Sequence, residues 1–238
     1  MKKIFVLSLG LFPLLLHAQY TPTSSEIYAT ALQANFASMT LPSVPDFTTK
    51  AQTVGSQYLF ETWVGGNITD LEGHNFSEGY LFNYNKVTQN LYIRIRDSAL
   101  ALLVPKEQLK QISLSDGLNS YQLQRVASLD SNQFFNVLVR GEKYSLYSLV
   151  KTRFVASEFF TNGVSSSGNP YDEFRDERTY YIQFANGRIQ ELPLKRKAVK
   201  AVFESEKEKV SSFFRNYNDA DHPFDEVFLK SLVEYLGS

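Results

Sequence analysis

The sequence predicts a mainly β protein of the α+β class, in which an antiparallel meander sheet forms a roll or barrel-like body and a C-terminal helical tail packs on it. Three observations lead to this fold class. Apolar and polar residues alternate repeatedly between residues 58 and 194, as they do in strands with one buried face. Tight-turn signals separate these segments. After Pro193 the apolar residues recur at the three- and four-residue spacing of helices.

The body is expected to hold about ten short strands joined mostly by short turns. Alternation marks five segments, at residues 80–84, 91–95, 111–114, 134–139 and 180–184. Residues 100–104 are apolar throughout, which predicts a strand covered on both faces. Four pairs predict tight turns: Asn186-Gly187 (type I′), Gly141-Glu142 (type II′), Glu72-Gly73 and Asp97-Ser98. The charged segment 162–178 lacks alternation and predicts a long loop.

The tail, residues 195–238, carries the helical spacing. Ser205 and Glu208 form a capping-box pattern, and Pro223 fits the first position of the last helix. Because short helices are not stable alone, we expect at least one of Phe213 and Phe214 to dock on the sheet.

The N-terminus has the pattern of a secretory signal peptide over residues 1–18. Lys2 and Lys3 precede an apolar run that is too short to span a bilayer. Ala18 is the small residue before the expected cut, so the mature chain would begin at or near Gln19. Nothing later in the sequence has the apolar length of a transmembrane helix, so the mature protein is expected to be soluble, not membrane-spanning, and periplasmic or extracellular.

Residues 19–238 are expected to form a single globular domain, with an N-terminal helix or extended segment (19–57), the β body (58–194) and the tail. The chain contains no cysteine, which excludes disulfides and thiolate chemistry. Its 24 basic and 25 acidic residues nearly balance, and this argues against a nucleic-acid partner, which would require a basic face.

The common catalytic and nucleotide-binding motifs are absent from the sequence, and we predict no catalytic residue, cofactor or metal site. His74 and His222 are the histidines of the mature chain, and both are expected in exposed turns. Asp70, Glu72 and His74 could offer metal ligands from one turn, but a lone hairpin rarely fixes a metal. A hydrolase that uses a carboxylate pair stays an open alternative.

Aromatic residues are the least ordinary feature of the composition, with 19 Phe and 14 Tyr. A ligand-binding aromatic face would use Tyr58, Trp63, Tyr80, Phe82 and Tyr84. The competing interpretation is that these residues fill the core, because aromatic residues favour strands. In addition, Asp97-Ser98-Ala99 is similar to a short O-glycosylation pattern of exported bacterial proteins, which makes Ser98 a candidate modification site.

The chain also resembles a broad set of functionally uncharacterised exported bacterial proteins that carry a signal peptide, a β-rich body and a short helical tail. The resemblance rests on a pattern over residues 53–238: Gly55-Ser56, Tyr58-Leu59, Trp63, Gly66, Ile68, Gly73, Tyr84-Asn85, the strand 91–95, Phe134-Phe135, Gly141-Glu142, Tyr180-Tyr181, Asn186-Gly187, the basic turn 195–200, Phe203 and Tyr235-Leu236. It implies export and this architecture, and it implies no catalytic residue.

These observations favour a binding role over catalysis. We expect an envelope structural or interaction module whose partner is an unknown envelope protein. The alternative is a module that binds a small ligand, such as a sugar, a peptide or a lipid, on an aromatic face.

Overall fold

The computed structural model describes residues 40–41, 53–96, 101–104, 106–217 and 223–238. It confirms a mainly β fold with a helical C-terminal tail. The strands are β1 (Thr40–Leu41), β2 (Thr53–Val54), β3 (Gly65–Asp70), β4 (Asn75–Phe76), β5 (Tyr80–Tyr84), β6 (Leu91–Ile95), β7 (Ala101–Val104), β8 (Leu109–Ser115), β9 (Ser120–Val126), β10 (Asp130–Val139), β11 (Tyr144–Val155), β12 (Phe160–Thr161), β13 (Ser166–Ser167), β14 (Asp172–Phe184) and β15 (Ile189–Glu191). The helices are α2 (Arg196–Val202), α3 (Lys207–Asn216) and α4 (Glu226–Gly237), with 3-10 turns η1 (Lys106–Gln108) and η2 (Glu204–Glu206).

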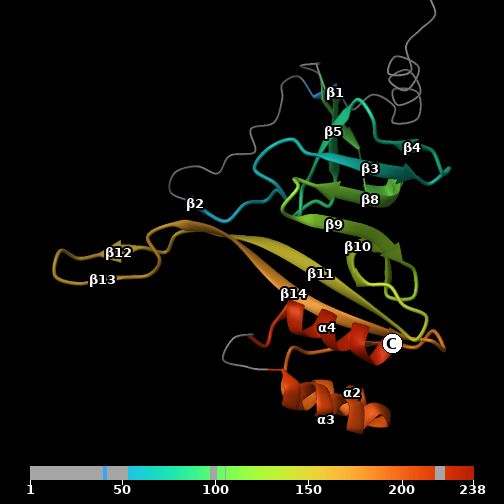
Figure 1. The fold of residues 1–238 in the computed structure, drawn as a ribbon. Helices are drawn as coiled ribbons and strands as arrows, with labels where there is room; N and C mark the ends of the chain where they lie inside the picture. Colours follow the sequence, from blue (N-terminus) through green and yellow to red (C-terminus); the bar gives the residue numbers. More distant parts are fainter. Residues whose placement is uncertain (1–39, 42–52, 97–100, 105, 218–222) are drawn as a thin grey trace, which may run out of the picture.

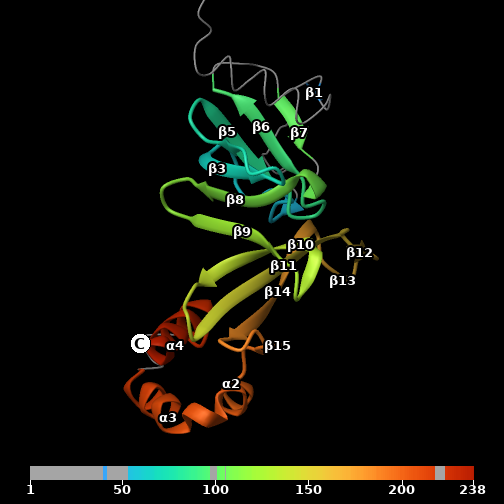
Figure 2. The same ribbon diagram turned by 90° about the vertical axis from the view of Figure 1, so that its right-hand side faces the viewer.

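A large sheet runs through the molecule from end to end (Figures 1 and 2). Its strand order is β15-β14-β11-β10-β9-β8-β3-β4, and β2 joins β14 as a parallel neighbour. The run from β8 to β11 is the expected antiparallel meander. A smaller sheet, in the order β1-β7-β6-β5, packs against the part of the large sheet that contains β3 and β8. The body is therefore built from two open sheets.

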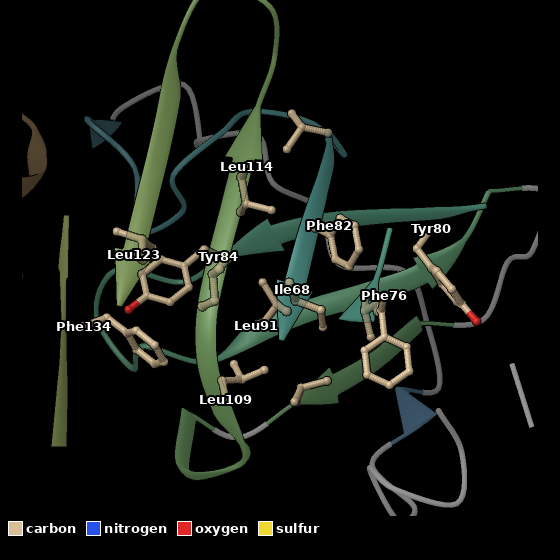
Figure 3. Close-up of a cluster of buried hydrophobic side chains, with 14 of the residues drawn as sticks. Ile68, Phe76, Tyr80, Phe82, Tyr84, Leu91, Leu109, Leu114, Leu123 and Phe134 are labelled. Carbon is tan, nitrogen blue, oxygen red and sulfur yellow. The ribbon is translucent and has the colours of Figure 1, made fainter. Parts of the chain in front are cut away.

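The first core cluster lies between the two sheets (Figure 3). The alternation of the sequence accounts for it, because Leu91 and Ile93 of β6 point inward and are fully buried, while Tyr92 and Arg94 are only half-buried. Inward side chains of β3, β4, β5, β7, β8, β9 and β10, together with Phe60 and Val64, complete this cluster.

The second core cluster lies where the helices cover the other half of the large sheet. α4 packs on β11 and β10, and α3 packs on α4. The Asp225 side chain caps α4 by accepting hydrogen bonds from the backbone amides of Val227 and Phe228, at 2.9 and 3.1 Å. Such caps satisfy amides that have no partner within the helix. The sequence had predicted that this helix begins at Pro223, but it begins after Asp225.

The docking of the tail also differs in detail from the prediction. Phe213 and Phe214 are half-buried, and their aromatic contacts are with Tyr217 just after α3, with residues of α4 and with the segment that leads into α4. Both rings contact Phe228 of α4, at centroid distances of 5.5 and 5.0 Å. The predicted capping box at Ser205 does not form, because residues 204–206 turn as a 3-10 segment and α3 begins only at Lys207.

The predicted charged loop at 162–178 is wrong over its second half. Residues 172–178 belong to β14, which pairs with β11 along its whole length, from Tyr144↔Phe184 to Val155↔Glu173. The two strands extend beyond the rest of the sheet as an arm that ends in the β12–β13 hairpin (Figure 1). Most side chains of residues 172–178 are exposed or half-exposed, so the segment has no alternation to reveal it as a strand.

Two hairpin turns differ from their predicted types, although both hairpins form. At β14–β15 the amide of Gly187 donates to the carbonyl of Phe184 at 2.9 Å, and Gly187 has φ = +81° while Asn186 does not have positive φ. This is a three-residue turn with glycine in the left-handed position, not type I′. Gly141 likewise lacks the positive φ that a type II′ turn requires. The Glu72-Gly73 hairpin is confirmed, with Gly73 at φ = +94°.

The expected signal peptide, the helix before residue 40 and the Asp97-Ser98 turn lie outside the described residues. Among the helices that are described, none combines the length and apolarity needed to cross a membrane.

Candidate functional site

A cleft of about 460 Å³ lies on the large sheet, between the smaller sheet and α4. Its floor comes from β9, β10, β11 and β14, and the start of α4 forms one wall. The opposite wall comes from the end of β5, the turn after it and Leu59. The cleft thus occupies the stretch of sheet that lies between the first and the second core clusters.

The floor changes character along the sheet face. On β11 and β14, Leu146 and Ile182 belong to the second core cluster. Further along the same face come Ser148 and then the cross-strand pair Val150↔Arg178. Ser148 pairs with Asn136 of β10, so two polar side chains lie side by side on the floor. Ser148 is only 2% exposed, and no hydrogen bond of its hydroxyl is found within the described residues. Polar groups are thereby placed between two apolar regions.

The wall opposite α4 contains an unusual residue, Gln89. Its backbone lies in the left-handed region at φ = +62°. No other non-glycine residue in the described part of the chain has a positive φ. The turn is held by Asn85, whose side chain accepts hydrogen bonds from the amides of Val87 and Thr88 at 2.9 and 3.0 Å. Such backbone conformations are uncommon outside glycine and recur at binding sites.

The side chain of Gln89 is also unusual. The residue is 9% exposed and lines the cleft, and its side-chain oxygen has no hydrogen-bond partner among the described residues. A buried acceptor without a partner costs about 1–3 kcal/mol. A hydrogen-bond donor, supplied by a ligand directly or by a water that bridges Gln89 and the ligand, would remove this cost.

Three cations and one carboxylate line the cleft: Lys86, Arg178, Lys230 and Glu226. Lys86 is neutralised by Asp176, with its Nζ 3.0 and 2.8 Å from the two carboxylate oxygens. Arg178 contacts Glu226 at 3.4 Å, which is at the long end for a hydrogen bond.

Two tyrosines near the floor are held in their neutral form: Tyr84 lines the cleft, and Tyr180 is the cross-strand neighbour of Ser148 but belongs to the second core cluster. Burial raises the pKa of Tyr180, and the neighbouring Glu226 carboxylate raises it further. Burial also raises the pKa of Tyr84 far above its usual value, against the opposing effect of Arg125. Both hydroxyls therefore remain protonated across the physiological range.

A second hollow of about 400 Å³ adjoins the cleft and shares Lys86, Gln89 and Val150 with it. It lies where β10 diverges from β11, with Asp130 on one side and Lys151 on the other. Hydrogen bonds from the Asn132 amide and the Gln133 side chain hold the pKa of the Asp130 carboxyl below its usual range.

The residues of the alternative aromatic face do not gather on one surface. Tyr80, Phe82 and Tyr84 share a face of β5, as expected, but all three are buried in the first core cluster. Figure 3 shows Tyr84 beside Leu123 and Phe134, at the end of the cluster opposite to Tyr80. The core interpretation is therefore correct for these three residues, because β5 is covered by the large sheet. Tyr84 also borders the cleft.

Tyr58 and Trp63 are half-buried and lie apart from that cluster. The Tyr58 ring meets Tyr92 edge-on at 5.7 Å, and Arg94 lies over the Trp63 ring at 4.8 Å. Tyr92 and Arg94 alternate with the core residues of β6, so these contacts do not join Tyr58 and Trp63 to the β5 aromatics. Ser98, the candidate modification site, lies outside the described residues.

Asp70, Glu72 and His74 do come together at the β3–β4 turn, with potential ligand atoms within 4.8 Å of one another. The buried Asp70 accepts hydrogen bonds from the backbone amide of His74 at 2.8 Å and lies 2.7 Å from its ring Nδ1. Both carboxylate oxygens thus already serve to hold the turn.

Sequence analysis did not single out Gln89, Ser148, Arg178 or Lys230. Polar residues that border a cleft carry no periodic signal, and they come from four separate segments. The Asn85–Asn90 turn offered a partial signal, because asparagine favours turns, but nothing in it indicates a buried glutamine.

The end of the arm is a second notable surface. Phe159, Phe160 and Val164 are 48%, 63% and 95% exposed, and Phe154 is 53% exposed on the stem. The Phe154 and Phe174 rings lie 5.2 Å apart across the two strands. Large apolar side chains gathered at an exposed projection are typical of interaction surfaces.

Comparison with known proteins adds no relative to this picture: no protein family, curated protein or solved structure matches the chain.

Proposed function

We propose that the protein is an exported binding module that holds a small ligand in the cleft between the smaller sheet and α4. The observation that carries this proposal is Gln89, whose strained backbone and unpartnered buried oxygen lie in the wall of a hollow of about 460 Å³. Hollows of this size, in which a few polar groups are placed among apolar side chains, are typical of small-molecule sites.

Binding of a neutral, environment-sensitive naphthalene probe would test this function. Val227 is exposed and lines the rim of the cleft, so Val227→Trp should fill the opening without disturbing the core. We expect this change to weaken probe binding about tenfold or more, which corresponds to about 1.4 kcal/mol. Fluorescence titration of both proteins measures the effect.

Val164→Trp is the matched control, because Val164 is exposed on the arm and does not line the cleft. It should leave probe affinity within about twofold of the original. Equal binding by the original protein and Val227→Trp would show that the probe binds elsewhere, and no binding by either would remove the support for a small-molecule site.

The export part of the proposal rests on the signal-peptide pattern of residues 1–18. Mass spectrometry of the native protein should find a mature chain that begins at or near Gln19. Recovery of chains that still begin at Met1 would contradict it.

A second candidate function is that of an envelope interaction module that binds a partner protein through the arm. The exposed Phe159 and Phe160 at its end favour this role. A photo-crosslinking residue at Phe160 should give one discrete adduct in intact cells, and the same residue at the exposed Tyr235 of α4 should not. The same adducts from both positions would indicate non-specific contact.

A further inference from the structure

We propose that the ligand of the cleft is an amphipathic anion, with its charged head at Arg178 and Lys230 and its apolar chain against the first core cluster. This inference rests on the function proposed above, because it assigns a ligand class to the same cleft.

The charges of the cleft favour an anion at the α4 end. Lys86 is matched by Asp176, and Arg178 has its 3.4 Å contact with Glu226. Lys230, one helical turn beyond Glu226, has no carboxylate within ion-pair distance in the described part of the chain. At this end the lining of the cleft therefore holds two cations, Arg178 and Lys230, and one carboxylate, Glu226. One positive charge is left without a counter-charge.

The other part of the cleft favours an apolar chain. Leu123 and Phe134 belong to the first core cluster and also line the cleft, together with the half-buried Leu59 and Tyr121. At the mouth, Leu118 of the β8–β9 turn is 93% exposed. An apolar chain lying here would cover a leucine that otherwise faces water, a gain that scales with the apolar area removed from water.

The two ends of the cleft therefore differ in charge and polarity, so the cleft fits a molecule with a charged head and an apolar chain. A neutral chain would fill the apolar part but leave the Lys230 charge uncompensated. A cationic head would be repelled by Lys230 and Arg178. An anionic head would accept charge-assisted hydrogen bonds from both side chains, which are stronger than neutral ones.

Titration calorimetry with three compounds of equal chain length tests this ligand class: dodecanoate and dodecyltrimethylammonium, kept below their micelle-forming concentrations, and dodecanol, kept below its solubility limit. We expect dodecanoate to bind about tenfold more tightly than dodecanol, and dodecyltrimethylammonium to bind more weakly than dodecanol. In Lys230→Gln, the affinity for dodecanoate should fall about five- to tenfold while that for dodecanol stays within about twofold.

Lys110→Gln is the matched control, because Lys110 is exposed on β8 and does not line the cleft. Lys110→Gln should leave all three affinities unchanged. Lys230→Gln should fold normally, because glutamine is as good a helix former as lysine.

The possible outcomes separate the two proposals. Equal affinities for dodecanoate and dodecanol, or an unchanged dodecanoate affinity in Lys230→Gln, would overturn the ligand class. If Val227→Trp still weakened dodecanol binding, the proposed function would stand without that class. If no dodecyl compound bound the original protein while the naphthalene probe still did, the ligand class would fail and the proposed function would stand.

Discussion

Replacing Phe228 by alanine is expected to destabilise the protein by about 3–5 kcal/mol, the usual cost of removing a large buried aromatic side chain. Phe228 is fully buried in the second core cluster. Its ring contacts Tyr217 and Phe224 at 4.7 and 4.4 Å, as well as Phe213 and Phe214. One side chain thus joins α3 and the segment before α4 to the helix that packs on the sheet. Denaturant unfolding curves of the two proteins measure the loss.

Phe154→Ala is the matched control for this prediction. Phe154 also has a ring partner, but it is more than half exposed on the arm, so its loss should cost less than about 1 kcal/mol. A loss below 1 kcal/mol for Phe228→Ala as well would mean that the helical tail does not pack on the body as described.

Asn83→Leu is expected to cost about 3 kcal/mol or more, although leucine is the more apolar side chain. Asn83 is fully buried, and its amide nitrogen donates to the carbonyls of Phe60 and Thr62 at 2.8 and 3.1 Å. Its oxygen accepts from the amide of Tyr84 at 2.8 Å and from that of Phe60 at 3.3 Å. Leucine would leave these backbone groups without partners, at about 1–3 kcal/mol for each one that stays buried. Thermal unfolding checks the effect.

Asn67→Leu provides the comparison, because Asn67 is exposed on β3. This change should stay within about 0.5 kcal/mol. Equal stability of the two asparagine variants would mean that the Asn83 side chain does not hold the segment around Phe60 to β5.

The elements that could be predicted from the sequence are those with one covered face. β5 and β6 alternate because one side of each faces the first core cluster, and the tail has helical spacing because α4 is buried along one side. The outer half of β14 was taken for a loop because both of its faces are open, so burial imposed no pattern. Turn types were missed because Asn186-Gly187 fits two hairpin geometries and the loop length decides between them.

The cleft could not be predicted for a different reason. Gln89, Ser148 and Lys230 are far apart in the sequence. They meet because the smaller sheet and α4 cover neighbouring parts of one face of the large sheet, and the part of β11 that carries Ser148 is left between them. The sequence also offered Tyr80 and Phe82 as part of a possible ligand face. Alternation shows which residues share a strand face, but it does not show whether another sheet covers that face.

The most direct test of the account is an amide NMR titration of the protein with dodecanoate. If the cleft is the binding site, the resonances that shift should be those of the floor and the two walls, around Asn136, Ser148, Gln89 and Val227. The Val164 and Gly73 amides, on the arm and at the β3–β4 turn, should not move. Shifts centred on the arm, or no saturable shifts up to millimolar dodecanoate, would contradict the proposal that this protein binds its ligand in the cleft.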